Sequence, residues 1–145
     1  PYLQTFVNEF KAQHAVDIRF TARHPDLRTK IDPSQLTQVL TNLCENGLRY
    51  SQMHTGEAKV EIIADIDKGS ELPYIEILDD GPGIPAKHIA NIFEPFFTTE
   101  ATGSGLGLYI SKELCEANQA SLSYRMNDAG KSCFRIHLTH HQRIF

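Results

Sequence analysis

Apolar and polar residues repeat along the chain with two different periods, which separate candidate helices from candidate strands. An apolar residue every three or four positions predicts a helix over the first dozen residues. Strict alternation over 16–20 then predicts a strand. Asp32 followed by Pro33 is typical of a helix start, with an acid as N-cap and proline at the first helical position. An apolar stripe continues this second helix to about Tyr50.

The second half of the chain contains more strands and ends with a pair of them. The elements expected there are strands over 60–66 and 73–79, a glycine-proline turn over 81–85, a short helical turn over 87–93, a compact loop over 96–104, a helix from about 105 to 118, and strands near 120–126 and 132–138. Strands and helices are mixed without a strict βαβ alternation. This pattern favours an α+β fold: a two-layer sandwich of a mixed, mostly antiparallel sheet with helices on one face.

Composition narrows the class of protein. The chain has 145 residues, 41% of them hydrophobic and 22% charged, which suits one globular domain over residues 1–145. The net charge of −4 and the absence of a basic stripe argue against nucleic-acid binding. No apolar run approaches the roughly 18 residues of a membrane span. Because the chain begins at Pro1 and not at Met, we expect a fragment of a longer protein, with any membrane attachment in missing upstream regions.

The cysteines and two of the glycine patterns point to no special chemistry. Cys44, Cys115 and Cys133 are far apart, with no C-x-x-C pair, so reduced core thiols in a cytoplasmic domain are expected. The segment 130–132 resembles the end of a phosphate-binding P-loop, but it lacks the earlier glycine and precedes a strand-like pattern. The segment 81–86 fits a loose dinucleotide fingerprint, yet its two prolines lack the amide hydrogens that hold a pyrophosphate.

Three further features suggest a polar pocket for an anionic ligand. Glycines over 103–108 precede a helix, where free amides and the helix dipole favour a phosphate, although a flexible turn is the alternative. Asn42 and Asn46 lie four apart on one helix face, in a pocket or in a structural polar network. Strand parity turns Asp79 toward the core with Ile77, where it can accept an adenine amino group or cap the following turn.

Four segments, in order, resemble the ATP-binding domain of sensor histidine kinases. Residues 38–51 resemble its N box, 79–84 its first glycine box, 93–97 its F box and 103–108 its second glycine box. That family shares the Bergerat-type nucleotide fold of DNA gyrase B, a heat-shock chaperone family and the mismatch-repair protein MutL. The short loop and the run 96–99 are most similar to nitrogen-regulation and type IV pilus sensor kinases.

The resemblance implies a role for each matching residue. Asn46 should coordinate Mg²⁺ through its amide oxygen, Asn42 should line the phosphate region, and Arg49 should reach the phosphates. Asp79 should accept the adenine amino group, with Tyr50 beside the nucleotide. Residues 96–104 should form a mobile lid over ATP. The complete set expected to bind ATP is Asn42, Asn46, Arg49, Tyr50, Asp79, Gly81, Gly83, Ile84, Phe97, Thr98, Thr99, Gly103, Ser104, Gly105, Leu106, Gly107, Leu108 and Ser132.

The chain departs from the family pattern at three places. The last glycine box, 129–134, is degenerate, and only the hydroxyl of Ser132 is carried over from it. Glu100 stands where the lid often has a basic residue. None of the seven histidines has the acidic neighbour and following motif of a phosphoacceptor, so the acceptor is expected on another domain.

The resemblance therefore implies a protein-histidine kinase catalytic domain. It should bind ATP and Mg²⁺ and donate the γ-phosphoryl group to a histidine on a separate dimerisation domain, with a response regulator downstream. The alternatives are an ATP-driven switch of the gyrase, chaperone or MutL type, or an anti-sigma-type serine kinase. The switch proteins use a glutamate to activate water where this chain has Asn42, and an amide cannot serve as that base.

Overall fold

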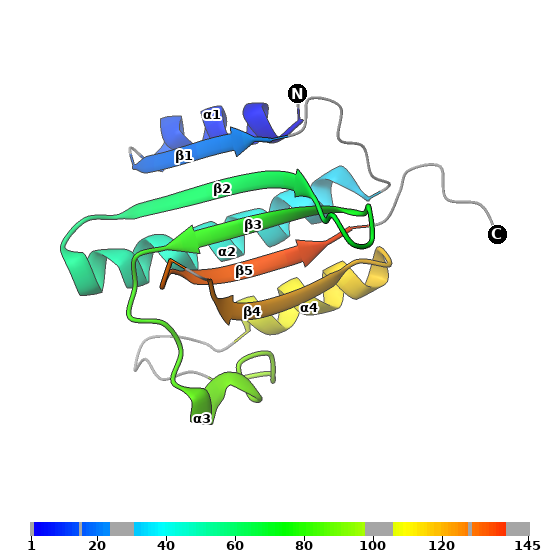
Figure 1. The fold of residues 1–145 in the computed structure, drawn as a ribbon. Helices are drawn as coiled ribbons and strands as arrows, with labels where there is room; N and C mark the ends of the chain where they lie inside the picture. Colours follow the sequence, from blue (N-terminus) through cyan, green and yellow to red (C-terminus); the bar gives the residue numbers. More distant parts are fainter. Residues whose placement is uncertain (1, 15, 24–30, 98–105, 128, 139–145) are drawn as a thin grey trace.

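The protein folds as one mixed sheet with helices packed on it (Figure 1). The computed structural model describes residues 2–14, 16–23, 31–97, 106–127 and 129–138. Its elements are α1 (Tyr2–His14), β1 (Asp17–Ala22), α2 (Pro33–Thr55), β2 (Lys59–Ile66), β3 (Pro73–Asp79), α3 (Ala86–Ile89), α4 (Gly107–Ala117), β4 (Ser121–Met126) and β5 (Ser132–His137).

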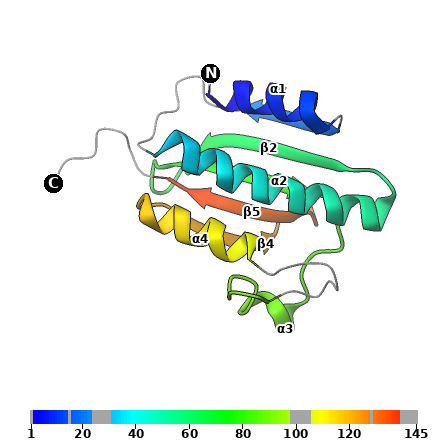
Figure 2. The same ribbon diagram turned by 180° about the vertical axis from the view of Figure 1, so that it is seen from behind.

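The five strands lie in the order β1-β2-β3-β5-β4, and only the β1–β2 pair is parallel. Helices α1, α2 and α4 cover the same face of this sheet, as the view from behind shows (Figure 2). The short α3 lies beyond the end of the sheet, below β4 in Figure 1. The predicted two-layer α+β sandwich with a mostly antiparallel sheet is confirmed.

The long helix α2 begins as predicted and ends later than predicted. The Asp32 carboxylate accepts hydrogen bonds from the backbone N–H of Ser34 at 2.9 Å and of Gln35 at 3.1 Å, which satisfies two amides of the first turn. The expected end at Tyr50 is wrong, because the helix continues to Thr55. It stops at Gly56, whose left-handed φ of 85° forms a C-cap that donates to the carbonyl of Gln52.

Two shorter elements also differ from the prediction. The helical turn expected over 87–93 is limited to α3, and three-residue turns follow, with Asn91 N–H donating to His88 and Glu94 N–H donating to Asn91. Helix α4 starts at Gly107, two residues after the approximate position expected. Its first intrahelical bond runs from the N–H of Ile110 to the carbonyl of Leu106 at 2.8 Å.

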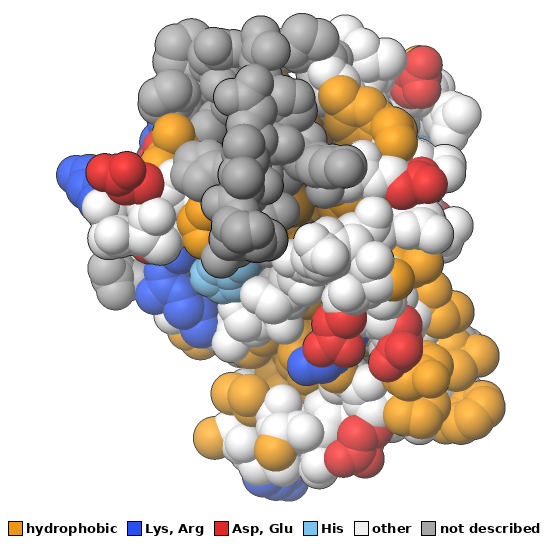
Figure 3. Space-filling view, turned by 90° about the vertical axis from the view of Figure 1, so that its right-hand side faces the viewer, with side chains coloured by type: hydrophobic (Ala, Val, Ile, Leu, Met, Phe, Trp, Pro, Cys, Tyr) orange, Lys and Arg blue, Asp and Glu red, His pale blue; other side chains and the backbone are white. Residues whose placement is uncertain are grey.

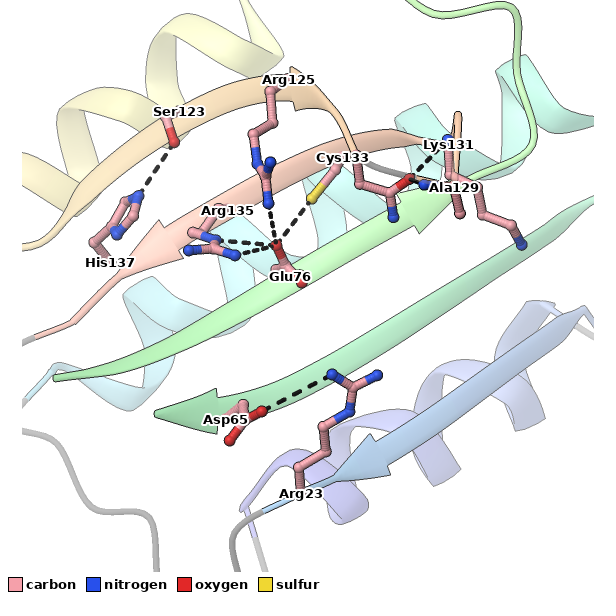
Figure 4. A network of polar contacts seen from close by, with 11 residues as sticks. Arg23, Asp65, Glu76, Ser123, Arg125, Ala129, Lys131, Cys133, Arg135 and His137 are labelled. Carbon is pink, nitrogen blue, oxygen red and sulfur yellow. Dashed lines mark hydrogen bonds and ion pairs between the residues drawn. The ribbon is translucent and has the colours of Figure 1, made fainter. Parts of the chain in front are cut away.

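Both faces of the central strand β3 are buried, whereas only its inner face was predicted to be. Ile75 and Ile77 point into the main core under the helices, as expected. On the outer face Glu76 is 7% exposed and accepts two hydrogen bonds from Arg135, at 3.0 and 2.7 Å (Figure 4). The Arg135 guanidinium also lies 4.1 Å from the ring centre of Tyr74. Arg135 donates twice to one carboxylate oxygen and stacks on Tyr74, and it thus shields a carboxylate that alternation alone would assign to solvent.

The expected core thiols are present, since Cys44, Cys115 and Cys133 are all free and buried. Burial raises the thiol pKa to about 12 for Cys44, about 11 for Cys115 and about 12 for Cys133. The thiols are therefore protonated at neutral pH and serve as packing groups. Within the part of the chain that the structure describes, no helix combines the length and apolar character of a membrane span.

Candidate functional site

The site forms where the end of β3 meets the middle of α2. Asp79 is the last residue of β3 and is 4% exposed. Helix α2 approaches it closely because Gly47 has no side chain. A Cβ atom added to Gly47 would lie 2.8 Å from Cγ1 of Val60 and 3.3 Å from Cβ of Asp79. A glycine in the interior of α2 therefore lets the helix rest on the strand ends and places the side chains beside Gly47 next to Asp79.

The Asp79 carboxylate is held in place by the backbone of the turn that follows it. Its Oδ1 accepts a 2.7 Å hydrogen bond from the N–H of Gly81, which is the turn cap anticipated as an alternative. Burial raises the pKa of Asp79 to about 6, and the hydrogen bonds from Gly81 and Ser132 oppose this rise. Asp79 also pairs with Ser132 in the β3–β5 register. The result is a buried, oriented acceptor at the edge of the helix layer.

The glycine turn after Asp79 is fixed by Tyr124, a residue outside the predicted set. The Tyr124 hydroxyl accepts a 2.9 Å hydrogen bond from the N–H of Ile84 and lies 3.0 Å from Oγ of Ser132. Gly83 has a left-handed φ of 81° and passes Met126 so closely that an added Cβ would lie 2.8 Å from its sulfur. The turn 81–84 is thus pinned against the ends of β4 and β5.

A second contact joins α2 to the start of α4. The Asn42 side chain donates to the carbonyl of Gly107 at 3.4 Å and to Oγ of Ser111 at 3.3 Å. Ser111, fully buried, donates to the same Gly107 carbonyl at 2.8 Å. The first turn of α4 is therefore fixed beside Asn42, with amides at the helix start that have no partner within the helix. Such a helix start favours a negatively charged ligand.

Asn46 lies about one turn beyond Asn42 along α2, and Arg49 lies about two turns beyond it. The Asn46 amide oxygen accepts a 3.1 Å hydrogen bond from Nη2 of Arg49. An amide oxygen is a hard ligand of the kind that Mg²⁺ takes together with phosphate oxygens and water. Asn46 thus fits the predicted metal ligand, in a position where the nearby guanidinium can also neutralise phosphate charge.

The F-box residues form a separate apolar corner next to α4. The Phe93 ring meets the core residue Phe134 edge to face at 6.2 Å, and Nζ of Lys112 lies 5.0 Å from its centre. Phe97 is half-buried against His88, with ring centres 5.4 Å apart. Phe96 is 72% exposed. Phe93 and Phe97 therefore anchor the segment that precedes residue 98.

Most of the predicted binding residues surround one region. Those of the described part lie at the middle of α2, in the turn after β3, at the start of α4 and at the start of β5: Asn42, Asn46, Arg49, Tyr50, Asp79, Gly81, Gly83, Ile84, Leu106, Gly107, Leu108 and Ser132. Phe97 lies in the apolar corner. Thr98, Thr99, Gly103, Ser104, Gly105 and most of the predicted lid lie outside the described residues.

Three supporting residues lie outside the predicted set. Gly47, Ser111 and Tyr124 each hold a predicted residue in place by contact or hydrogen bond. A glycine inside a strongly periodic helix is a recognisable signal of close approach, so Gly47 could have been found. Ser111 and Tyr124 carry no such signal, because their partners come from other elements.

The fold is a mixed sheet with helices on one face. Its site combines a buried carboxylate, a glycine turn and a helix start, and this combination is typical of the nucleotide-binding fold of an ATPase. The chain matches the family described as "Histidine kinase-, DNA gyrase B-, and HSP90-like ATPase" over residues 31–142, which is more than half of its length. It belongs to this family, whose ligand is ATP. The predicted resemblance to sensor histidine kinases is confirmed.

The curated relatives are sensor kinases. The chain is 47% identical over 145 residues to the sensor protein kinase PilS of Pseudomonas aeruginosa, which agrees with the expected likeness to type IV pilus kinases. It is 33% identical over 125 residues to the sensor histidine kinase WalK of Bacillus subtilis. The matches include 99% and 81% of this chain but only 27% and 20% of the relatives. The chain thus spans about a quarter of their length.

Solved structures show the same architecture. The catalytic domain of histidine kinase ThkA superposes with a TM-score of 0.73 at 26% identity, covering 95% of this chain and 89% of that one. The mycobacterial sensor histidine kinase MprB, at 22% identity, shares the fold with a TM-score of 0.73 and 95% coverage of this chain.

Proposed function

We propose that this domain binds Mg·ATP and donates the γ-phosphoryl group to a histidine on a separate dimerisation domain, in a two-component system with a response regulator. The buried, oriented carboxylate of Asp79 is the observation that carries the proposal. Its Oδ1 is taken by the Gly81 amide, which fixes the plane of the group. A fixed acceptor at the edge of a pocket suits the amino group of adenine.

The remaining groups suit a triphosphate that extends from Asp79 toward α4. Asn46 would hold Mg²⁺, which neutralises phosphate charge when bound. Arg49 would contact the phosphates, and the amides at the start of α4 would bind their oxygens. Phosphoryl transfer depends chiefly on positioning and charge neutralisation, so a domain can catalyse it without a nucleophile of its own.

The orientation of Glu45 favours phosphoryl transfer over hydrolysis of ATP. Glu45 lies on the exposed side of α2, and its carboxylate is 3.8 Å from Nε2 of His14 in α1. It is therefore turned away from the face that carries Asn42 and Asn46. Asn42 holds α4 and cannot act as a general base, which disfavours an ATPase switch of the gyrase or chaperone type.

The segment around α3 offers a docking surface for the partner domain. In the space-filling view hydrophobic side chains gather in the lower part of the molecule, the level at which α3 lies in Figure 1 (Figure 3). Ile89 and Phe96 of this segment are 40% and 72% exposed. An apolar surface next to the phosphate end of the site would bring an acceptor histidine within reach of the γ-phosphoryl group. Free thiols suit a reducing compartment, and ATP is available in the cytoplasm, so a cytoplasmic domain is part of this proposal.

Calorimetric titration with Mg·ATP tests the proposal. Asp79→Asn keeps the bond from Gly81 but presents an amide that can turn its NH₂ toward the adenine amino group. We expect binding to weaken about tenfold to a hundredfold, since a charge-assisted hydrogen bond contributes roughly 1.5–3 kcal/mol. Asp65→Asn, on β2, is the matched control and should bind like the wild type. Equal affinity of wild type and Asp79→Asn would remove Asp79 from adenine recognition.

A transfer assay tests the proposed donation of the γ-phosphoryl group to a histidine on another domain. The chain is mixed with labelled ATP and the histidine-bearing hairpin domain of a PilS-type kinase. Label should appear on the hairpin and vanish with Asn46→Ala. Label on the present chain alone, or steady ATP hydrolysis that depends on Glu45, would contradict the transfer mechanism.

A further inference from the structure

Ser111 is a fully buried polar residue on α4, the helix that begins beside the proposed phosphate site. Its hydroxyl donates a 2.8 Å hydrogen bond to the carbonyl of Gly107, one turn earlier in the same helix. Asn42 of α2 donates to the same carbonyl at 3.4 Å and to Oγ of Ser111 at 3.3 Å. Two side chains from different helices therefore converge on one carbonyl group, and the bond from Ser111 is the shorter of the two.

The number of available protons fixes the direction of these bonds. Ser111 uses its single hydroxyl proton on the Gly107 carbonyl, so toward Asn42 it acts as an acceptor. Asn42 uses its two Nδ2 protons on Ser111 and Gly107, while its Oδ1 accepts a 3.1 Å bond from Nε2 of Gln38. A reversed Asn42 amide would turn its oxygen toward the Gly107 oxygen. Asn42 is thus held in one orientation, with both of its protons used inside the protein.

The Gly107 carbonyl belongs to the same peptide group as the N–H of Leu108. That amide lies in the first turn of α4, because the first intrahelical bond runs from Ile110 to Leu106, so it has no partner within the helix. Hydrogen bonds to the carbonyl oxygen polarise the peptide group and make its N–H a stronger donor. They also fix the plane of the peptide, and with it the direction of this N–H.

We propose that Ser111 is a positioning residue for phosphate binding, which orients and polarises the Gly107–Leu108 peptide so that the N–H of Leu108 donates to a phosphate oxygen. Asn42 supports the same peptide from α2. The inference rests on the proposed binding of Mg·ATP. Because the adenine half of the site is built on the end of β3, the Ser111 hydroxyl should affect binding of the triphosphate and not of the base.

Titrations with Mg·ATP and with adenosine separate the phosphates from the base. NMR chemical shifts of the isotope-labelled protein measure both affinities and also follow the Leu108 amide directly. Ser111→Ala removes only the hydroxyl. We expect Mg·ATP to bind about threefold to tenfold more weakly, as for the loss of one hydrogen bond, while adenosine changes by less than about twofold. In the wild type the Leu108 amide proton should shift downfield with Mg·ATP but not with adenosine, and Ser111→Ala should reduce that shift.

Thr55→Val is the matched control. Thr55 also donates at 2.8 Å to the carbonyl one turn earlier in its helix, that of Ser51, but at the far end of α2. Valine keeps the shape of the side chain and removes the hydroxyl, so both affinities and the Leu108 shift should stay as in the wild type. Far-UV circular dichroism at low temperature verifies that each variant is folded, and the Leu108 shift in the wild type is a test that needs no variant.

The outcomes distinguish this inference from the proposed function. If the wild type does not bind Mg·ATP, the proposed function fails. If it binds Mg·ATP but the Leu108 amide does not move, or moves equally with adenosine, Leu108 is not the phosphate donor. If Ser111→Ala binds Mg·ATP as tightly as the wild type, or loses Mg·ATP and adenosine by the same factor, Ser111 only packs and the positioning role is wrong.

Discussion

Gly47 offers a direct test of how the site is assembled. Replacing it with alanine adds one methyl group inside α2. That methyl would lie 2.8 Å from Cγ1 of Val60 and 3.3 Å from Cβ of Asp79, where ordinary contacts need about 3.5–4.0 Å. Val60 has a stiff side chain on a strand paired on both sides, so it cannot move away freely. Helix α2 and the end of β3 must separate instead.

Two opposing effects set the expected magnitude. Alanine is favoured over glycine inside a helix by about 0.8–1.0 kcal/mol. Overpacking a well-filled interior costs about 1–3 kcal/mol. Because both contacts are with atoms near the backbone, we place this site in the upper part of that range. Gly47→Ala should therefore lower the free energy of unfolding by about 1–2 kcal/mol in spite of its better helix propensity.

Urea denaturation followed by circular dichroism measures this difference, with Gly107→Ala as the matched control. Gly107 starts α4 and has no heavy atom within 4 Å of an added Cβ. That variant should be as stable as the wild type or up to about 1 kcal/mol more stable. Gly47→Ala should also bind ATP more weakly, because the displaced strand end carries Asp79. A Gly47→Ala variant that is stabilised like Gly107→Ala would refute the close-approach argument.

Three further predictions concern charge and burial. The pKa of Asp79 is raised to about 6 in the folded protein, against an ordinary 3.8, so the folded state binds the carboxyl proton more tightly than the unfolded state does. Stability therefore falls as the pH rises from about 4 to about 6 and Asp79 ionises. The stability of Asp79→Asn relative to the wild type should therefore increase between about pH 4 and pH 6, and the difference should stay constant above pH 6. Urea midpoints at each pH measure this difference, and a difference that does not change with pH would contradict the argument. Arg135→Ala should destabilise the fold by about 3 kcal/mol, because the buried Glu76 loses the guanidinium that donates to it twice. ATP affinity should stay unchanged in calorimetry, since both side chains lie on the outer face. Thiol titration at pH 7 should find no rapid reaction in the native protein and three reactive groups in denaturant, because all three thiols are buried with raised pKa values; fast native labelling of any one would show that its burial is misjudged.

Local signals in the sequence predict most of the fold, and they fail where no local signal exists. Asp32 and Pro33 mark the start of α2 because capping depends on neighbouring residues alone. The end of α2 was missed because residues 51–55 tolerate a helix and only Gly56 stops it. The burial of Glu76 depends on Arg135, a residue 59 positions away, so strand alternation could not reveal it.

The same distinction holds for the site. The inward direction of Asp79 follows from strand parity with Ile75 and Ile77, and the structure places it there. The hydroxyl of Tyr124 reaches Ile84 only because β4 and β5 pair in one particular register. The pattern of a strand does not encode which partner its residues will face across the sheet, so a supporting residue of this kind becomes visible only in three dimensions.

The strand order has a consequence for how the chain acquires its structure. β5 is the last strand of the described residues but lies between β3 and β4, inside the sheet. The first three strands can pair beneath α1 and α2 as soon as they exist, yet β3 then keeps one open edge until residues from 132 onward arrive. Its pairing with β5 joins positions about 60 apart, and such distant contacts slow folding. Until β5 pairs with β3, Ser132 and Tyr124 are not yet in place beside Asp79 and the glycine turn, so the nucleotide pocket forms only when the sheet is complete. ATP should therefore bind only the fully folded chain and stabilise it against unfolding by mass action.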